Sequence, residues 1–357
     1  MKGTRIKSVT VEPVNIPLHE PFTIAIGTKY NIENAFVTIR LENGIEGIGE
    51  AAPLEPINGE NQATVLATLN SCREFLTGQD VVHYRQVSKH LKSVFWAQVT
   101  ARCAIEMAMI DAFTRSLGIP LYRFLGGAEE SLETDYTIDI VPPDTARSNA
   151  IKLKNKGYRT IKTKVGKNLV NDIDRLLAIR EGAPDCMLML DANQGYTGPQ
   201  AVHFLNELEK NNIRPEIFEQ PVAKHDLAGM RFVKEHTSVP IAADESVFTS
   251  ADAIRVVREG CADFINIKLM KSGIVEAFDI AAIARSANIG LMIGCMLETK
   301  LALSCSVHFA AGLGGFRFVD LDPHLSPDQE PVTGGAAFTD PMYQLNAGLP
   351  GIGVVRK

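Results

Sequence analysis

The sequence contains no motif that would bind a metal ion through nitrogen or sulfur. No two of its six cysteines form a CxxC pair, and its eight histidines form no HxxxH or HExxH pattern. The cysteines stand among apolar or helical neighbours, which favours buried free thiols over disulfides or metal ligands. They are Cys72, Cys103, Cys186, Cys261, Cys295 and Cys305. Any metal ion is therefore expected to be bound by oxygen.

Long apolar runs and basic clusters are also absent. No apolar stretch approaches the roughly 20 residues of a membrane span. The chain has 36 basic and 42 acidic residues, a net charge of −6, which argues against a nucleic-acid or membrane surface. The N-terminal residues alternate like a strand and lack the core of a signal peptide. We expect a cytoplasmic protein without nucleic-acid or membrane partners.

Nucleotide-binding fingerprints are missing as well. The segments GIEGIG (44–49) and GLPGIG (348–353) have the wrong order and context, and no GK[ST] occurs. A doubly wound open sheet is therefore the weaker alternative. Instead, eight short apolar runs alternate with amphipathic helical patterns, which predicts a closed eight-stranded parallel barrel. The runs lie near 135–141, 158–165, 186–191, 215–219, 239–243, 262–268, 290–295 and 317–321.

The first part of the chain has a different pattern. Residues 5–16 and 35–50 alternate around a turn at Asn43-Gly44, which is typical of an antiparallel hairpin or meander. A helical pattern follows from about 60 to 117 and stops at Gly118 and Pro120. We predict an α+β domain over 1–125, the barrel over 126–325, and a segment at 326–357 that returns to the first domain.

Three acidic residues end apolar runs of the predicted barrel. Asp191 in LMLDAN, Glu219 in EIFEQP and Asp244 in IAADES are 28 and 25 residues apart, about one strand-plus-helix unit. The carboxyl ends of parallel barrel strands meet at one face, where function lies. Because buried unpaired carboxylates are very costly, three of them imply a shared cation, most plausibly Mg²⁺.

Three lysines lie at the ends of the second and sixth runs. Lys162 and Lys164 in RTIKTKVG are two apart and share one face of a strand, and Lys268 ends FINIKL. A solvated edge strand is the alternative for the first two. On the second and sixth strands, Lys164 and Lys268 would lie across the barrel from each other. Such bases suit removal and return of a proton α to a metal-bound carboxylate, through an enediolate. Positive charge from Lys162 and the metal should lower the lysine pKa values.

The motif formed by these lysines and carboxylates resembles the muconate-lactonizing-enzyme subgroup of the enolase superfamily, and the similarity covers essentially the whole chain. Lysine bases and Mg²⁺-stabilised enediolates are established for this superfamily. The resemblance implies a (β/α)7β modified TIM barrel with an N-terminal α+β capping domain. It also implies one Mg²⁺ per subunit on Asp191, Glu219 and Asp244, with Lys162, Lys164 and Lys268 as the catalytic lysines.

Within this subgroup, Asp320-Leu321-Asp322 resembles the D-x-D of dipeptide epimerases, which receives the α-ammonium group of the dipeptide. Taken alone, the pair also fits a helix cap or a turn. The segments TDYT (134–137), GCMLETK (294–300) and PFTIAIGT (21–28) are similar to dipeptide epimerases too. The resemblance implies that Thr137, Met296 and Glu298 contact the substrate.

The sequence departs from the family at one position. Relatives acting on L-Ala-D/L-Glu carry an arginine where this chain has Gly27, and its apolar neighbours would be Ile24, Leu54 and Leu297. A pocket without arginine should not favour an acidic side chain. We therefore expect an apolar or uncharged residue to be epimerised, while Glu55 leaves a cationic one open.

Other activities of the subgroup stay open at this point. They are N-acylamino-acid racemase, cycloisomerase and o-succinylbenzoate synthase, besides a metal-binding barrel without catalysis. We expect the partner to be a small dipeptide substrate and the protein to be a homo-oligomer.

Overall fold

The structure is a computed structural model that describes residues 3–24, 27–326 and 328–357, without the side chains of 19–24 and 27. Its central element is an eight-stranded sheet in which all neighbouring strands are parallel and follow chain order. The backbone N–H of Asp135 donates to the carbonyl of Val319 at 3.0 Å, which brings the first and last strands together. The prediction of an eight-stranded barrel is confirmed, and an open doubly wound sheet is excluded. The strands are β5 (Tyr136–Ile138), β6 (Thr160–Lys164), β7 (Met187–Asp191), β8 (Ile217–Glu219), β9 (Ile241–Ala243), β10 (Phe264–Ile267), β11 (Gly290–Gly294) and β12 (Phe316–Asp320).

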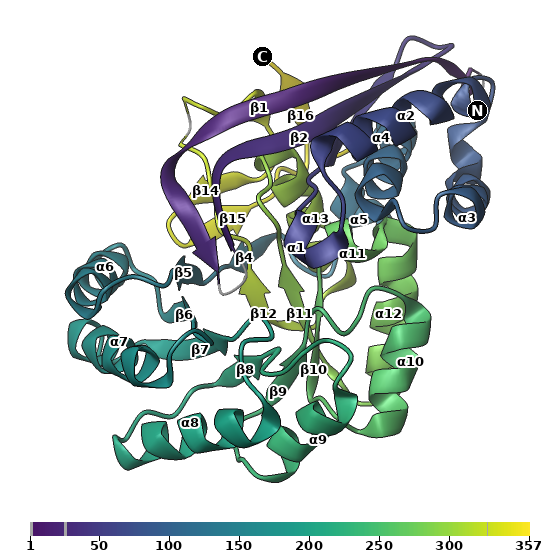
Figure 1. Cartoon of the computed structure of the whole chain (residues 1–357). Helices are drawn as coiled ribbons and strands as arrows, with labels where there is room; N and C mark the ends of the chain where they lie inside the picture. Colours follow the sequence, from purple (N-terminus) through teal and green to yellow (C-terminus); the bar gives the residue numbers. More distant parts are fainter. Residues whose placement is uncertain (1–2, 25–26, 327) are drawn as a thin grey trace.

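Helices connect the barrel strands and cover their outer side (Figure 1). Local sequence sets their ends. At the start of α10, for example, the Thr249 hydroxyl accepts from the backbone of Asp252, whose carboxylate accepts in return. Among the described residues, no helix is long and apolar enough to cross a membrane. The helices are α6 (Pro143–Asn155), α7 (Leu169–Gly182), α8 (Gly198–Lys210), α9 (Leu227–Glu235), α10 (Ser250–Glu259), α11 (Leu269–Ser272), α12 (Ile274–Ser286) and α13 (Lys300–Leu313).

An apolar cluster fills the inside of the barrel. It contains Met189, Ile217, Ala242 and Phe318, each two residues before an acidic residue near the end of its strand. Because alternate residues of a strand share a face, the acidic side chains must point inward above this cluster. The cluster therefore closes the barrel below and leaves its carboxyl end polar.

The N-terminal part is an antiparallel meander with helices packed on it. Gly44 forms the predicted turn with a positive φ of 85°. Gly49 allows close approach of α4, because a Cβ atom there would lie 2.0 Å from the carbonyl oxygen of Ala104. The elements are β1 (Ile6–Ile24), β2 (Gly27–Leu41), β3 (Glu46–Ala51), α1 (Glu55–Asn58), α2 (Gln62–Leu76), the 3-10 turn η1 (Val81–His83), α3 (Tyr84–Val94), α4 (Val99–Leu117) and α5 (Leu121–Phe124).

The last segment contains four short strands that the sequence analysis did not predict. β14 (Ala337–Thr339) and β15 (Met342–Gln344) form a sheet with β4 (Ser131–Glu133), and β13 (Val332–Gly334) pairs with β16 (Val354–Arg356). This segment returns to α4. Ile352 N donates to Asp111 Oδ1 at 2.7 Å, and Arg115 Nη2 donates to the carbonyl of Val354 at 2.6 Å.

Candidate active site

Lysines and carboxylates meet at the carboxyl end of the barrel. Lys162 Nζ lies 2.6 Å from Glu219 Oε2 and 3.1 Å from Asp191 Oδ2. Lys164 Nζ lies 2.7 Å from the same Asp191 oxygen. Lys162 and Lys164 are 0% and 6% exposed, which excludes a solvated edge strand. Since Asp191, Glu219 and Lys164 are the last residues of their strands, the barrel itself brings them together.

Lys268 approaches the same region from the other side of the barrel. It directly follows β10, and its Nζ lies 2.8 Å from Asp244 Oδ2. Asp244 directly follows β9 and is 1% exposed. Across the barrel ends, the six predicted metal ligands and lysines thus form one buried group of alternating charge.

The carboxylates of this group act on the pKa values of two of its lysines. Burial disfavours the charged form of Lys268, yet Asp244 and Glu219 together raise its pKa. Burial also opposes the charge of Lys162, and Asp320, Glu219 and Asp191 nevertheless hold its pKa well above the usual value. The ammonium groups of these two lysines thus balance the carboxylates, and the predicted lowering of the pKa of the basic lysines stays a prediction. It would require a cation that shares the same oxygens.

The three predicted metal ligands fit a hard cation in chemistry and orientation. One oxygen of each carboxylate contacts a neighbouring group of the protein. Asn266 Nδ2 donates to Glu219 Oε1 at 2.7 Å, and Asn193 N donates to Asp191 Oδ1 at 2.9 Å. Lys271 Nζ lies 2.6 Å from Asp244 Oδ1. The second oxygen of each faces the active-site lysines. Such outer contacts orient carboxylates for metal binding.

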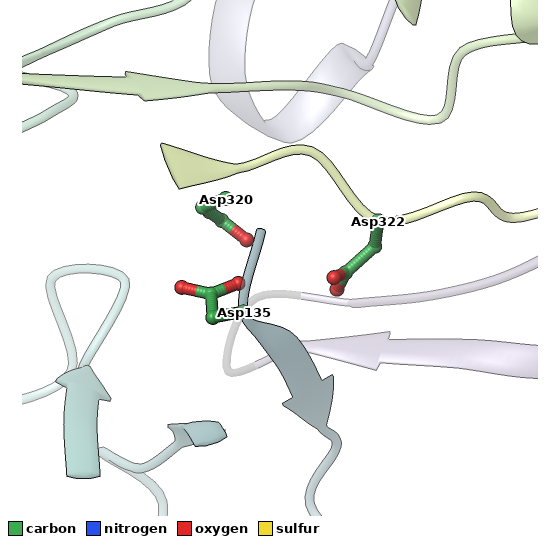
Figure 2. A group of neighbouring side chains, drawn as sticks. All are labelled: Asp135, Asp320 and Asp322. Atoms are coloured by element: carbon green, nitrogen blue, oxygen red, sulfur yellow. The ribbon is translucent and has the colours of Figure 1, made fainter. Parts of the chain in front are cut away.

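A second acidic cluster, drawn in Figure 2, is joined to the first group by the contact of Asp320 with Lys162. Asp135, Asp320 and Asp322 each place one oxygen within 4.8 Å of the others, and all three are buried. Among the described residues, these three carboxylates are close enough to one another to hold a single ion. The oxygens of Asp191, Glu219 and Asp244 do not all lie this close together. Asp320 comes from the end of β12, Asp322 from the following loop, and Asp135 from just before β5.

The members of this cluster differ in how they are partnered. Asp320 Oδ2 accepts from Lys162 Nζ at 2.6 Å. Asp322 Oδ2 accepts from the backbone N–H of Thr137 at 3.0 Å, while its Oδ1 has no hydrogen-bond partner among the described residues. Neither oxygen of Asp135 has one. Burial and the charge of Asp320 raise the pKa of Asp322 to about 7, and burial with both neighbouring carboxylates raises that of Asp135 further. Buried oxygens without partners indicate a place for a hydrogen-bond donor or a cation.

The sequence analysis missed Asp135. The signal was present, because Asp135 stands two residues before Thr137 in TDYT and an extended backbone points both side chains to one side.

A small pocket connects both groups. Lys164, Lys268, Asp320, Asp322 and Thr137 share it with apolar residues. His324 Nε2 lies 3.0 Å from the carbonyl of Met296, and burial lowers the His324 pKa to about 4, so this ring is neutral. Besides Leu54 and Met296, the lining includes four residues absent from our prediction: Ile57, Asn193, Cys295 and His324.

The remaining predicted residues lie around this pocket. Glu298 is buried and accepts from the backbone N–H of Met296 at 2.9 Å, and burial raises its pKa to about 8. Leu297 packs with Ile32 and Leu325 in a separate apolar cluster. Glu55 is exposed and accepts from Asn61 at 2.9 Å. None of Glu298, Leu297 and Glu55 lines the pocket. The side chain of Ile24 and the surroundings of Gly27 lie outside the described residues.

The cysteines are free, as predicted. Five are buried, and the half-buried Cys295 lines the pocket.

The fold and the lysine–carboxylate group define a barrel enzyme with an N-terminal cap. Residues 145–356 match the family model "Enolase C-terminal domain-like". Residues 6–126 match that of the mandelate racemase / muconate lactonizing enzyme N-terminal domain. The chain belongs to the mandelate racemase / muconate lactonizing enzyme family of the enolase superfamily.

Relatives with assigned activities align over nearly the whole chain. An aromatic dipeptide epimerase of Herpetosiphon aurantiacus is 40% identical, with 98% of this chain and 99% of the relative covered. An L-Ala-D/L-Glu epimerase of Thermotoga maritima is 39% identical, with 93% and 96% covered. The crystal structure of a dipeptide epimerase from Enterococcus faecalis, complexed with Mg and L-Leu-L-Tyr, superposes with a TM-score of 0.94 at 35% identity, covering 99% and 100%.

Proposed function

We propose that this protein is a Mg²⁺-dependent dipeptide epimerase that inverts the α-carbon of the C-terminal residue of a dipeptide. The observation that carries this proposal is the set of buried carboxylate oxygens without partners on Asp322 and Asp135, beside the pocket that Lys164 and Lys268 line. A dipeptide carries an α-ammonium group, which donates three hydrogen bonds and suits such a cluster. N-acylated amino acids, muconate and succinylbenzoate precursors carry no cation there.

Asp191, Glu219 and Asp244 would hold the metal ion, since they offer buried oxygen ligands that outer contacts already orient. When bound, Mg²⁺ would supply Lewis-acid stabilisation to the substrate carboxylate. The ligands are drawn from three successive strands, so the barrel sets their spacing.

The two lysines of the pocket would move the proton. One of Lys164 and Lys268 takes the α-hydrogen as a proton at its Nζ, and the other returns a proton to the opposite face of the planar intermediate. They enter the pocket from β6 and from the end of β10, on different sides of the barrel. A general base contributes about 10²–10⁴-fold, so the buried positive charge of Lys162 and the metal must supply a large further share.

The pocket favours an uncharged side chain on the epimerised residue. Leu54, Ile57 and Met296 form its apolar part. Its basic groups are the two lysines and the neutral His324, and no arginine lines it among the described residues. Lys164 is paired with Asp191 and Lys268 with Asp244, so an acidic side chain would be desolvated without an unpaired cationic partner among the described residues.

A steady-state assay on a dipeptide panel tests this proposal. We expect kcat/KM for L-Ala-L-Leu and L-Ala-L-Phe to exceed that for L-Ala-L-Glu. N-acetyl-L-Leu, which lacks the ammonium, should be converted far more slowly than the dipeptides. A clear preference for L-Ala-L-Glu would refute the side-chain assignment, and a preference for the acylated amino acid would favour a racemase instead.

Three further expectations stay predictions. Limited proteolysis tests the domain boundaries near 125 and 325, light scattering tests the homo-oligomer, and fractionation of the source cells tests the cytoplasmic location.

A further inference from the structure

A second and larger cavity lies between the N-terminal part and the barrel. Its volume of about 430 Å³ falls within the range of small-molecule sites. One wall comes from α1, α3 and α4, and the other from the segments that follow β8 and β9 and from the helices beyond them. It is distinct from the active-site pocket, and Ile57 of α1 lines both.

Arg102 of α4 lines this cavity without a hydrogen-bonding partner. Arg102 is only 4% exposed, and its Nε is buried and has no hydrogen-bond partner. No N–H of its guanidinium donates to an acceptor among the described residues. A buried Nε–H that makes no hydrogen bond is costly and rare. It indicates that an acceptor belongs in the cavity.

The nearest acidic groups balance the charge of Arg102 but do not bond to it. Glu60 uses both carboxylate oxygens to accept from the backbone N–H of Thr100, at 3.2 and 3.1 Å. Glu106 accepts from Ser88 Oγ at 2.5 Å and from Ile274 N at 2.6 Å. No hydrogen bond joins either carboxylate to Arg102 among the described residues, so the guanidinium keeps hydrogen-bonding capacity for another group.

Most of the other charged side chains of the lining are paired. Lys224 Nζ lies 5.7 Å from the centre of the Phe248 ring and has no acidic partner among the described residues. Two other basic residues are paired: Lys92 with Glu276 at 2.5 Å, and Arg255 with Asp252 at 3.7 Å. Lys271 also lines the cavity and is paired with Asp244. Glu245 is a further acidic residue of the lining. Among the lysine and arginine side chains of the described lining, Arg102 and Lys224 are those without an ion-pair partner.

Aromatic surface completes the cavity. Trp96 lines it from the N-terminal part and is 76% exposed. Phe248 lines it from the barrel side. We propose that this cavity binds a small organic anion, with its phosphate or carboxylate on Arg102 and Lys224 and its apolar body against Trp96 and Phe248. The planar guanidinium of arginine can donate two parallel hydrogen bonds to two oxygens of a carboxylate or a phosphate, and aromatic rings are common in ligand pockets. This second site does not depend on the proposed activity.

Tryptophan fluorescence offers a specific test, because Trp96 is the only tryptophan of the chain. Phenyl phosphate is titrated into the full-length protein, with inorganic phosphate and phenol as separate arms for the anion and the apolar body. Each titration is run with saturating Mg²⁺ and with EDTA, so that binding to the active-site metal is recognised. We expect a saturable change with phenyl phosphate that is independent of EDTA, and weaker binding of either half alone.

Variants then locate the ligand. Arg102→Gln and Lys224→Gln should each weaken phenyl phosphate binding by at least about tenfold, the loss typical of a hydrogen bond to a charged group. The exposed Arg258→Gln and Lys89→Gln are matched controls outside the cavity and should not change it. Should Arg102→Gln fail to fold, the part-exposed Lys224→Gln and its control carry the test.

Three results would overturn the proposal. They are no saturable change up to about 10 mM, far above typical ligand affinities; equal affinity in cavity and control variants; and loss of binding with EDTA, which would place the anion on the active-site metal.

Discussion

Lys162 Nζ lies 2.6 Å from Asp320 Oδ2 and thereby joins the two acidic clusters of the active site. The same nitrogen contacts Glu219, so one buried ammonium balances a predicted metal ligand and the first aspartate of the D-x-D pair. The two aspartates of that pair are therefore not equivalent. Asp320 is already partnered, whereas Asp322 and Asp135 have oxygens without a hydrogen-bond partner among the described residues, where we propose that the ammonium group binds.

Replacing Asp322 should weaken the use of dipeptides. Asp322→Asn removes a charged acceptor from the proposed ammonium site, so we expect kcat/KM for L-Ala-L-Leu to fall by about 10–100-fold, the range for a hydrogen bond to a charged group. Steady-state kinetics measures this loss. The exposed Asp174→Asn on α7 is the matched control and should leave kcat/KM unchanged. Unchanged activity of Asp322→Asn would make the ammonium assignment wrong.

The same residue predicts a pH dependence. Burial and Asp320 raise the pKa of Asp322 to about 7 in the substrate-free protein. Above this pH the carboxylate is charged and binds ammonium; as the pH falls through 7 it takes up a proton and binding is lost. We expect kcat/KM to decrease by up to about tenfold for each pH unit below 7. A profile that is flat between pH 8 and pH 6 would contradict this, and Asp322→Asn should lose this limb.

The sequence predicted those site residues that stand at the same position, the carboxyl end, of successive barrel strands. Asp191, Glu219 and Asp244 end successive apolar runs, and the parity of Lys162 and Lys164 sets which face they share. Asp135 was harder to find, because β5 has only three residues and gives little periodicity. Ile57 and His324 reach the pocket from a short helix and a loop, whose course depends on tertiary packing rather than on any local pattern.

The fold shows the same division. The eight barrel strands and the meander follow from apolar runs and turn residues. The short strands β13 to β16 have three residues each and give little periodicity; β14 and β15 form a local hairpin, whereas β15 pairs with β4 and β13 with β16 across longer separations. The direction of the Lys268 pKa also depended on distances, since only the structure shows Asp244 Oδ2 at 2.8 Å.

The two lysines should be separable by isotope exchange. Lys164→Ala and Lys268→Ala should each lower epimerisation by about 10²–10⁴-fold or more, because each removes one of the two acid–base groups. Each variant keeps one lysine and should still exchange the α-hydrogen of one enantiomer of the C-terminal residue in D₂O. The exposed Lys167→Ala, in the loop after β6, is the control. Exchange of both enantiomers by either variant would rule out one base on each face.

The metal assignment rests on Asp191, Glu219 and Asp244 and is tested by calorimetry. Asp244→Asn should weaken Mg²⁺ binding at least about tenfold, since it removes a charged oxygen ligand. The exposed Asp279→Asn on α12 should bind Mg²⁺ like the unaltered protein. Chelation with EDTA should abolish turnover and added Mg²⁺ should restore it. Unchanged Mg²⁺ affinity of Asp244→Asn would remove this residue from the ligand set.

The most direct test of the proposed activity is proton NMR of L-Ala-L-Leu incubated with the protein and Mg²⁺ in D₂O. The account predicts that the α-proton signal of the leucine residue disappears while that of alanine stays, and that L-Ala-D-Leu containing deuterium accumulates. Retention of the leucine α-proton in this and other uncharged dipeptides, with the protein folded and Mg²⁺ bound, would contradict it.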